Sequence, residues 1–224
     1  MNNRYKLVVF DWEGTLVDAL GQVLQCINAA ATALNYGTVD LATARRYVAL
    51  GLPTAIIKLF PHLSTPEFEI LLQKIQQLIT LGAKKNTISL LPGAQLVVES
   101  LKQRGVYLAI ASNKGAQSLT RALHHSGLQN CFTIVKAAGT LPPKPSPQML
   151  EEILTECMVS NTDTLMIGDS ISDMQMARSV NVDAIGIDFY NYNTEILLQA
   201  GALTVFNDYN KLMLFLEQQG RYSQ

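Results

Sequence analysis

Two acidic side chains, Asp11 and Glu13, directly follow the apolar run of residues 7–10. This run is short, continuous and rich in β-branched and aromatic residues, which predicts a strand buried on both faces. With one residue between them, the two carboxylates would point the same way in an extended segment, towards one ion or one phosphoryl group. Gly14 permits a sharp turn or a close approach to a ligand, and Thr15 adds a hydroxyl and a backbone N–H. The same pattern also suits an ordinary polar turn whose acids face water, so the remaining chain must decide.

Three further polar clusters lie just after apolar, strand-like runs, or in the loop that follows one. They are Ser112 with Asn113, Lys144, and Asp169 with Asp173; Asp11 with Glu13 is the first cluster of this kind. Because the carboxyl ends of parallel strands share one edge of a sheet, these side chains are expected to lie together. Four weak signals then become one stronger signal for a single site.

Phosphoryl transfer is the chemistry that these residue types could share. It needs charge neutralisation, positioning and a nucleophile, and a carboxylate can be that nucleophile by forming an aspartyl-phosphate. Mg²⁺ prefers hard oxygen ligands, so Asp11 and Asp169 could hold it with the backbone carbonyl of residue 13, while Asp173 supports the site. Ser112 could bind phosphate oxygens, and Lys144 could balance the negative charge of nucleophile and phosphate.

The elements that must position these residues alternate along most of the chain. Strands are expected at 7–10, 106–111, 132–135, 164–168, 184–187 and 203–206. Helices are expected at 93–104, 117–126, 194–199 and 207–219, with two more that end at residues 157 and 180. Alternating strands and helices predict an α/β fold with a parallel sheet covered on both faces. Residues 17–86 instead carry only helical patterns, over 19–34, 40–49, 54–60 and 65–81. We therefore expect a core of residues 1–16 and 87–224 with a helical module, residues 17–86, inserted through linkers at 15–17 and 82–87.

The composition excludes several classes of protein. The chain has 224 residues, is 48% hydrophobic and 16% charged, and carries a net charge of −1, which suits a soluble globular protein. It shows no basic nucleic-acid-binding surface and no apolar run long enough to span a bilayer. Because the first strand is expected as early as residue 7, we expect no signal peptide. Cys26, Cys131 and Cys157 lack metal-ligand spacing and indicate buried thiols in a reducing cytoplasm.

The four clusters, in their order, resemble the four motifs of the haloacid dehalogenase-like hydrolase superfamily. Within it, Ser112-Asn113-Lys114 and Lys144-Pro145-Ser146-Pro147 look most like the phosphoglycolate phosphatase branch, and the helical insert resembles that superfamily's small cap domain. The resemblance implies a Rossmann-like three-layer core with strand order of about 3-2-1-4-5. It implies a Mg²⁺-dependent phosphatase that acts through a phospho-aspartate.

By position, the resemblance assigns a role to each motif residue. Asp11 would be the nucleophile, Ser112 would bind the phosphate, and Lys144 would hold nucleophile and phosphate together. Asp169 would bind the metal with support from Asp173.

Glu13 departs from the resembling phosphatases, which usually carry Asp at this position as the general acid and base. The unperturbed pKa of Glu is about 4.3 against about 3.9 for Asp, so the proton chemistry is available, but the side chain is longer by about 1.5 Å. Glu13 could therefore work with local adjustment, work poorly, or mark a protein that has kept only a binding or regulatory role. A sugar-phosphate mutase on the same scaffold is a further alternative to the phosphatase.

Several other residues could take part in binding. Arg45 could hold a substrate carboxylate or lie on a solvated helix face, and Gly51 is a candidate turn residue of the cap near the site. Lys114 could bind phosphate or only lie on the surface of its loop, and Asn113 could bond near Glu13 or cap the next helix.

The expected partner is a small phosphorylated metabolite, with phosphoglycolate as the first candidate. The protein is expected to be a monomer or homodimer with no nucleic-acid or membrane partner.

Overall fold

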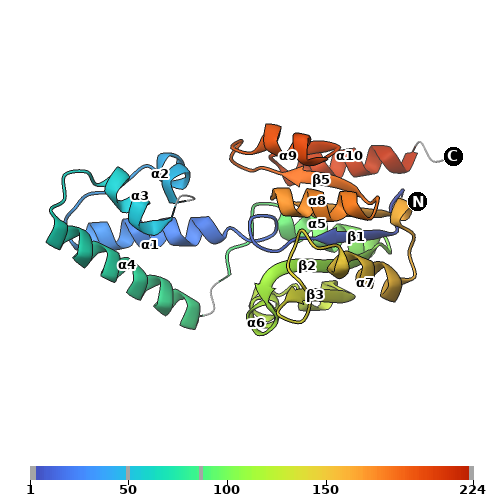
Figure 1. The fold of residues 1–224 in the computed structure, drawn as a ribbon, viewed down its shortest axis with the longest axis horizontal. Helices are drawn as coiled ribbons and strands as arrows, with labels where there is room; N and C mark the ends of the chain where they lie inside the picture. The colour runs from blue at the N-terminus through green and yellow to red at the C-terminus, as the bar shows by residue number, and fades with distance from the viewer. Residues whose placement is uncertain (1–3, 49–50, 86–87, 222–224) are drawn as a thin grey trace. The chain divides into compact units, whose positions relative to one another are not determined.

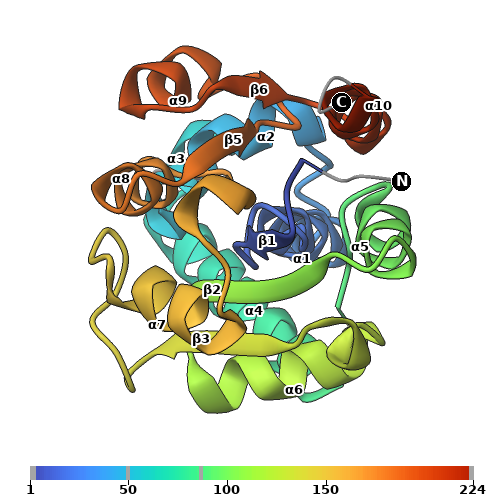
Figure 2. The same cartoon turned by 90° about the vertical axis from the view of Figure 1, so that its right-hand side faces the viewer.

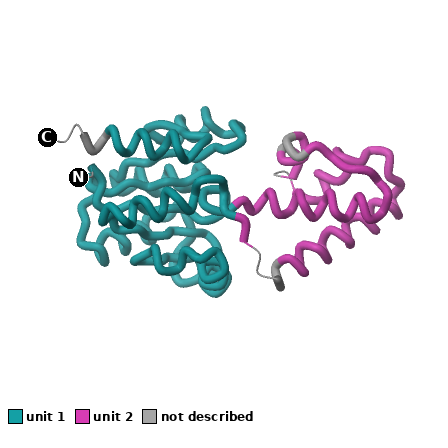
Figure 3. Tube along the Cα trace, turned by 180° about the vertical axis from the view of Figure 1, so that it is seen from behind, with its two compact units in different colours: residues 1–17, 90–224 teal, residues 18–89 magenta. Residues whose placement is uncertain are grey.

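The computed structural model describes residues 4–48, 51–85 and 88–221. The chain forms two compact units: a core unit of residues 1–17 and 90–224, and a helical unit of residues 18–89 (Figure 3). The chain passes from one unit to the other twice, after residue 17 and after residue 89. The core-unit residues next to these two points are paired: Val17 and Leu90 form an antiparallel bridge, and Leu91 N–H donates to the Leu16 carbonyl at 2.9 Å.

The core unit is built on a six-stranded sheet (Figure 1). Its strands are β1 (Leu7–Phe10), β2 (Tyr107–Gly115), β3 (Ile134–Ala138), β4 (Thr164–Gly168), β5 (Asp183–Ile187) and β6 (Thr204–Phe206). All neighbouring pairs are parallel and the order is β3-β2-β1-β4-β5-β6. The expected Rossmann-like order is confirmed, with β6 added as an edge strand.

Helices cover both faces of the sheet (Figure 2). One face carries α5 (Ala94–Gln103), α6 (Ala116–Ser126) and α10 (Tyr209–Arg221), and the other carries α7 (Gln148–Cys157), α8 (Ile171–Ser179) and α9 (Thr194–Ala200). Short 3₁₀ turns occur at Gln129–Cys131 and Asn161–Asp163. Right-handed crossovers between parallel strands produce this division of the helices.

Strand β1 lies at the centre because its four residues are apolar and all buried. Successive side chains point to opposite faces, so Leu7 and Val9 join the apolar cluster beneath α7 and α8, while Phe10 stacks edge-on against Phe132. Fully burying a Val, Leu or Phe side chain is worth about 1.5–3 kcal/mol. The apolar run therefore fixes where the polar residues that follow it leave the sheet.

The helical unit has an apolar core of its own. Its helices are α1 (Ala19–Ala33), α2 (Leu41–Val48), α3 (Leu52–Leu59) and α4 (Thr65–Lys85). Leu24, Ile27, Ile56, Leu71 and Ile75 are buried together at the centre of the unit. Among the described residues, no helix is long and apolar enough to cross a membrane.

Some expected boundaries are wrong. Helix α4 continues through Gly82 to Lys85, so the expected linker at 82–87 begins too early; residues 86–87 lie outside the described residues. Strand β2 runs on through Ser112 to Gly115 with a register shift against β3. A single glycine is tolerated inside a helix and polar residues in a strand end, so neither boundary has a clear local signal.

Candidate active site

The carboxyl ends of β1 and β4 bring two acids to the same edge of the sheet. Asp11 follows β1, and its N–H donates to the Ile167 carbonyl at 2.9 Å, which continues the pairing with β4. Asp169 follows β4, and its Oδ1 accepts a hydrogen bond from Thr15 Oγ1 at 3.2 Å. Thr15 is fully buried, so the turn after β1 and the turn after β4 are tied together at this point.

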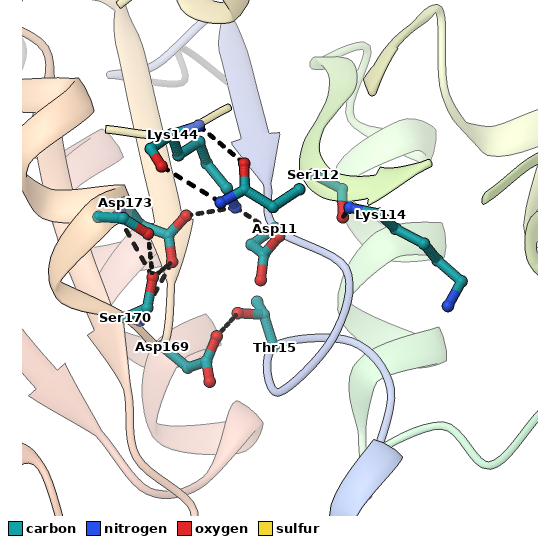
Figure 4. Close-up of polar contacts among 10 residues, drawn as sticks. Asp11, Thr15, Ser112, Lys114, Lys144, Asp169, Ser170 and Asp173 are labelled. Carbon is teal, nitrogen blue, oxygen red and sulfur yellow. Dashed lines mark hydrogen bonds and ion pairs between the residues drawn. The ribbon is translucent and has the colours of Figure 1, made fainter. Parts of the chain in front are cut away.

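The ammonium group of Lys144 contacts the carboxylates of both Asp11 and Asp173 (Figure 4). Its Nζ lies 2.6 Å from Asp11 Oδ1 and 2.6 Å from Asp173 Oδ1. The Lys144 side chain is only 3% exposed. A buried lysine with two carboxylate partners is held in one position. Lys144 therefore fixes the position of the Asp11 carboxylate and also offsets its negative charge.

The backbone of Lys144 is itself held by Asn113. The Lys144 N–H donates to Asn113 Oδ1 at 2.7 Å, and Asn113 Nδ2 donates to the Lys144 carbonyl at 3.2 Å. The expected alternatives for Asn113, a bond near Glu13 or a helix cap, are replaced by this double hydrogen bond. Sequence reasoning missed it because the two residues are 31 positions apart and no local pattern links them.

Asp173 is positioned by the first turn of α8. Ser170 N–H donates to Asp173 Oδ2 at 3.1 Å and Asp173 N–H donates to Ser170 Oγ at 3.4 Å, which together form a capping box. The Ser170 hydroxyl also donates to Asp173 Oδ2 at 2.6 Å. Asp173 is fully buried. A Cβ on Gly168 would lie 2.4 Å from the Asp173 side chain, so glycine is required where the strand ends. The Ser-x-x-Asp spacing is a local signal that could have predicted this cap.

The acids of this cluster repel one another. Burial and the charge of Asp173 raise the pKa of Asp11 to about 6, although Lys144 lowers it. Burial and the charges of Asp11 and Asp173 likewise raise the pKa of Asp169 well above its ordinary value. For Lys144, burial lowers the pKa, but the two carboxylates outweigh burial and raise it. The cluster therefore carries more negative charge than Lys144 neutralises.

These residues fit a divalent cation. Carboxylate oxygens of Asp11, Asp169 and Asp173 lie within 4.8 Å of one another. Hard oxygen donors suit Mg²⁺, and a cation would relieve the repulsion that raises the two pKa values. The turn after β1 passes close to these acids: at Gly14 (φ +85°), a Cβ would lie 2.0 Å from Asp169 Oδ2. Only glycine allows that approach.

Glu13 lies apart from this cluster. Its Oε1 pairs with Lys114 Nζ at 2.6 Å, and the Glu13 side chain is 47% exposed against 26% for Lys114. Lys114 belongs to the end of β2, where its N–H donates to the Oγ of buried Ser112 at 3.2 Å. Because Phe10 pairs with Ile110, Ser112 leaves the sheet at the same edge as Asp11.

The other expected binding residues lie in the helical unit. Arg45 is buried there and donates two hydrogen bonds to Asp18, at 2.9 and 2.5 Å, so its guanidinium is engaged inside that unit. Asp18 also caps α1 by accepting from Gly21 N–H at 2.9 Å. Gly51 precedes α3 with φ +101°, which is a turn conformation that favours glycine. A substrate role for Arg45 or Gly51 stays a prediction.

A tyrosine from the last helix also supports the site, and sequence reasoning missed it. Tyr209 of α10 is buried, and its hydroxyl donates to the Thr15 carbonyl. Burial and the charges of Asp169 and Asp11 raise the pKa of Tyr209, which keeps it a neutral donor. No local signal marks this contact, because it joins residues 194 positions apart.

Comparison with known proteins connects this geometry to one family. Residues 8–187 match the family model described as haloacid dehalogenase-like hydrolase. A phosphoglycolate phosphatase of Colwellia psychrerythraea is 30% identical over 226 residues, covering 95% of this chain and 97% of the relative. A phosphoglycolate phosphatase of Psychrobacter arcticus is 27% identical over 222 residues, covering 94% of this chain and 95% of the relative.

Solved structures share the fold. A hydrolase from Pseudomonas syringae superposes with a TM-score of 0.63 at 26% identity, covering 95% of this chain and 98% of that one. A subfamily IA hydrolase of the same superfamily from Geobacter sulfurreducens superposes with a TM-score of 0.65 at 18% identity, covering 96% and 97% of the two chains. At 18% identity the second likeness speaks for the fold alone.

Proposed function

The chain belongs to the haloacid dehalogenase-like hydrolase family, and we propose that it is a Mg²⁺-dependent phosphatase of small phosphate monoesters. The observation that carries the proposal is the buried contact of Lys144 with Asp11 and Asp173, beside Asp169. This contact holds the Asp11 and Asp173 carboxylates at the sheet edge, next to the Asp169 carboxylate, which Lys144 does not contact. Such an arrangement suits a carboxylate nucleophile that must approach an anionic phosphate.

In the first step we assign attack to Asp11. A carboxylate oxygen of Asp11 forms a bond to phosphorus, and the bond from phosphorus to the leaving oxygen breaks. Glu13 gives its proton to that oxygen, so the product leaves as an alcohol. Lys144 and the Ser112 hydroxyl donate to phosphate oxygens and offset their charge.

In the second step water attacks the aspartyl-phosphate. Glu13 takes a proton from the water, a new bond forms between water oxygen and phosphorus, and the bond from phosphorus to Asp11 breaks. Inorganic phosphate leaves and the Asp11 carboxylate is restored. Asp169 and Asp11, with the carbonyl of residue 13 and support from Asp173, would hold the Mg²⁺, which supplies positive charge next to the transferred phosphoryl group.

The proposed substrate is a small ester such as phosphoglycolate, after the relatives that carry that name. The proposed cap is the helical module, expected at 17–86, which would close over such a substrate and exclude water. We also propose a cytoplasmic location, which the free thiols of Cys26, Cys131 and Cys157 support; all three are partly buried rather than fully buried.

The test is phosphate release from a panel of small phosphate esters, with Mg²⁺ and with a chelator. We expect Mg²⁺-dependent release in the wild type and its loss, by at least about 10³-fold, in Asp11→Asn, because an amide cannot attack phosphorus. Asp163→Asn is the matched control, since Asp163 pairs with Lys6 where β1 and β4 begin, at the other end of these strands from Asp11 and Asp169. Release that persists with chelator, or in Asp11→Asn, would overturn the proposal.

A further inference from the structure

The pair between Lys114 and Glu13 keeps the Glu13 carboxylate away from the buried cluster. Their 2.6 Å contact is partly exposed on both sides, and the group of clustered carboxylates consists of Asp11, Asp169 and Asp173 without Glu13. Figure 4 shows Lys114 extending away from Asp11 and Lys144. In this arrangement Glu13 is drawn towards the end of β2 rather than towards the nucleophile.

Catalysis as proposed above requires the opposite arrangement. Glu13 must deliver its proton to the leaving oxygen, which is bonded to the phosphorus that Asp11 attacks. The Lys114–Glu13 contact must therefore open during turnover. An exposed ion pair favours its closed form over its open form by only about fivefold at most. A modest competing interaction is therefore enough to open the contact between Lys114 and Glu13.

The position of Lys114 indicates what would compete. Its N–H is bonded to the hydroxyl of Ser112, the residue proposed to bind the phosphate. The Lys114 backbone therefore lies beside the proposed phosphate position, and by turning from Glu13 its side chain would reach a group a few bonds from that phosphate. The ammonium of Lys144 is already held between Asp11 and Asp173, whereas Lys114 has an exposed partner that an anion can replace.

We propose that Lys114 selects substrates that carry a carboxylate close to the phosphate ester, and that its transfer to this carboxylate releases Glu13 for proton transfer. The inference rests on the proposed phosphatase function and adds a specificity residue to it. The longer reach of Glu relative to Asp then has a use, because it allows the resting contact with Lys114. Recognition and proton transfer are coupled through one exchangeable ion pair.

The test compares three esters that differ in the group beside the phosphate: 2-phosphoglycolate, 2-hydroxyethyl phosphate and ethylene glycol bisphosphate. In Lys114→Met we expect kcat/KM for 2-phosphoglycolate to fall at least about tenfold, the usual scale for losing a charged hydrogen bond. For 2-hydroxyethyl phosphate we expect a rise of up to about fivefold, because Glu13 is no longer held. Loss on the bisphosphate alone would assign Lys114 to a second phosphate and overturn the carboxylate assignment.

Two control variants sharpen the comparison. Lys211→Met removes an exposed lysine of α10 that bonds Asn207, and it should leave the ratio between the three esters unchanged. Lys114→Arg keeps a cation and should keep the preference for 2-phosphoglycolate. Equal losses on all three esters in Lys114→Met would contradict the inference, since they would indicate a general role in structure or catalysis.

A binding measurement separates recognition from turnover. In the Asp11→Asn background, calorimetric titration with 2-phosphoglycolate should give a Kd at least about tenfold weaker when Lys114→Met is added, and an unchanged Kd would contradict the inference. A wild type without Mg²⁺-dependent release from any ester would overturn the proposed function, and the inference with it. Release without the predicted change of preference would overturn the inference alone.

Discussion

A substitution at Glu13 tests the proposed proton transfers directly. Glu13→Gln keeps the size of the side chain but removes its proton, so turnover should fall about 10²–10⁴-fold. Attack by Asp11 on an ester with a good leaving group, such as 4-nitrophenyl phosphate, needs less help from an acid. We therefore expect a burst of nitrophenol equal to the enzyme concentration, followed by slow hydrolysis of the phospho-enzyme.

Rapid-mixing absorbance measurements would record that burst. Full steady-state turnover in Glu13→Gln would mean that another group moves the proton. Absence of both burst and turnover in a wild type that binds Mg²⁺ would favour the non-catalytic alternative. Transfer of the phosphate to a second hydroxyl of a sugar phosphate, in place of water, would favour the mutase.

Asp11 links catalysis to stability. Its pKa in the folded protein is about 6, above the ordinary 3.8, because it is buried beside Asp173. Between pH 4 and 6 the folded state therefore binds a proton that the unfolded state does not, and this contribution to the free energy of unfolding is lost as the pH rises. In metal-free buffer at pH 7.5, Asp11→Asn should be more stable than the wild type, by up to about 3 kcal/mol.

Urea unfolding with chelator at pH 7.5 and at pH 4 would measure this difference. The gap between variant and wild type should narrow at pH 4, where the Asp11 carboxyl of the wild type is protonated when folded. A variant that is less stable than the wild type at pH 7.5 would show that the contact of Asp11 with Lys144 outweighs the repulsion.

From the sequence, it is easier to predict which residues lie close together than to predict the contacts that they make. Asp11 and Asp169 could be placed together because each directly follows a buried apolar strand, and parallel strands end at one edge. The pairing of Lys114 with Glu13 could not, because it depends on the conformations of two long side chains. The clamp of Asn113 on Lys144 depends on the path of a proline-rich loop, which no periodic pattern describes.

At the level of elements, the loop that carries Lys144 depends on Asn113 at the end of β2. Asn113→Ala removes both hydrogen bonds to the Lys144 backbone, so the lysine should lose its fixed position against Asp11. Since a misplacement of about 1 Å can cost about 10²-fold in rate, we expect kcat to fall by one to two orders of magnitude.

A matched asparagine separates this effect from stability. Asn161 also bonds backbone groups on both sides, donating to the Val180 carbonyl and accepting from Thr162 N–H, but it lies before β4, at the other end of that strand from Asp169. Asn161→Ala should lower the unfolding temperature by a similar amount and leave kcat unchanged. Equal losses of kcat in the two variants would contradict a specific role for Asn113.

Element types could be predicted more reliably than element ends. The periodicity of residues 65–81 predicts α4, but its last turn contains Gly82, which resembles a stop signal and is helical here. Strand β3 covers Ile134–Ala138 rather than 132–135, and it follows a 3₁₀ turn at Gln129–Cys131. Such ends are decided by tertiary packing, which overrides weak local preferences.

For the molecule as a whole, a bound cation should act as a stabilising ligand. The clustered acids repel one another, so Mg²⁺ binding to the folded state should raise the unfolding temperature by several degrees. At a concentration 100 times the Kd, the gain is about 2.7 kcal/mol. Scanning calorimetry with MgCl₂ against KCl of equal ionic strength would show it, and Asp169→Asn should lose most of the effect. An identical shift in Asp169→Asn would mean that the cation binds elsewhere.

The two units offer a test of the proposed division of labour. Each has its own apolar core, and residues 16 and 91 are joined by a backbone hydrogen bond at the crossing. Replacing residues 18–89 with a short glycine-serine loop should therefore leave a core unit that unfolds cooperatively and binds Mg²⁺. It should still hydrolyse acetyl phosphate, whose leaving group needs little help, and it should keep the preference for 2-phosphoglycolate over 2-hydroxyethyl phosphate that we assign to Lys114. Its turnover of these esters should fall, because the proposed cap no longer excludes water. Loss of the preference for 2-phosphoglycolate in this shortened protein would place substrate selection in the helical unit and contradict the role proposed for Lys114.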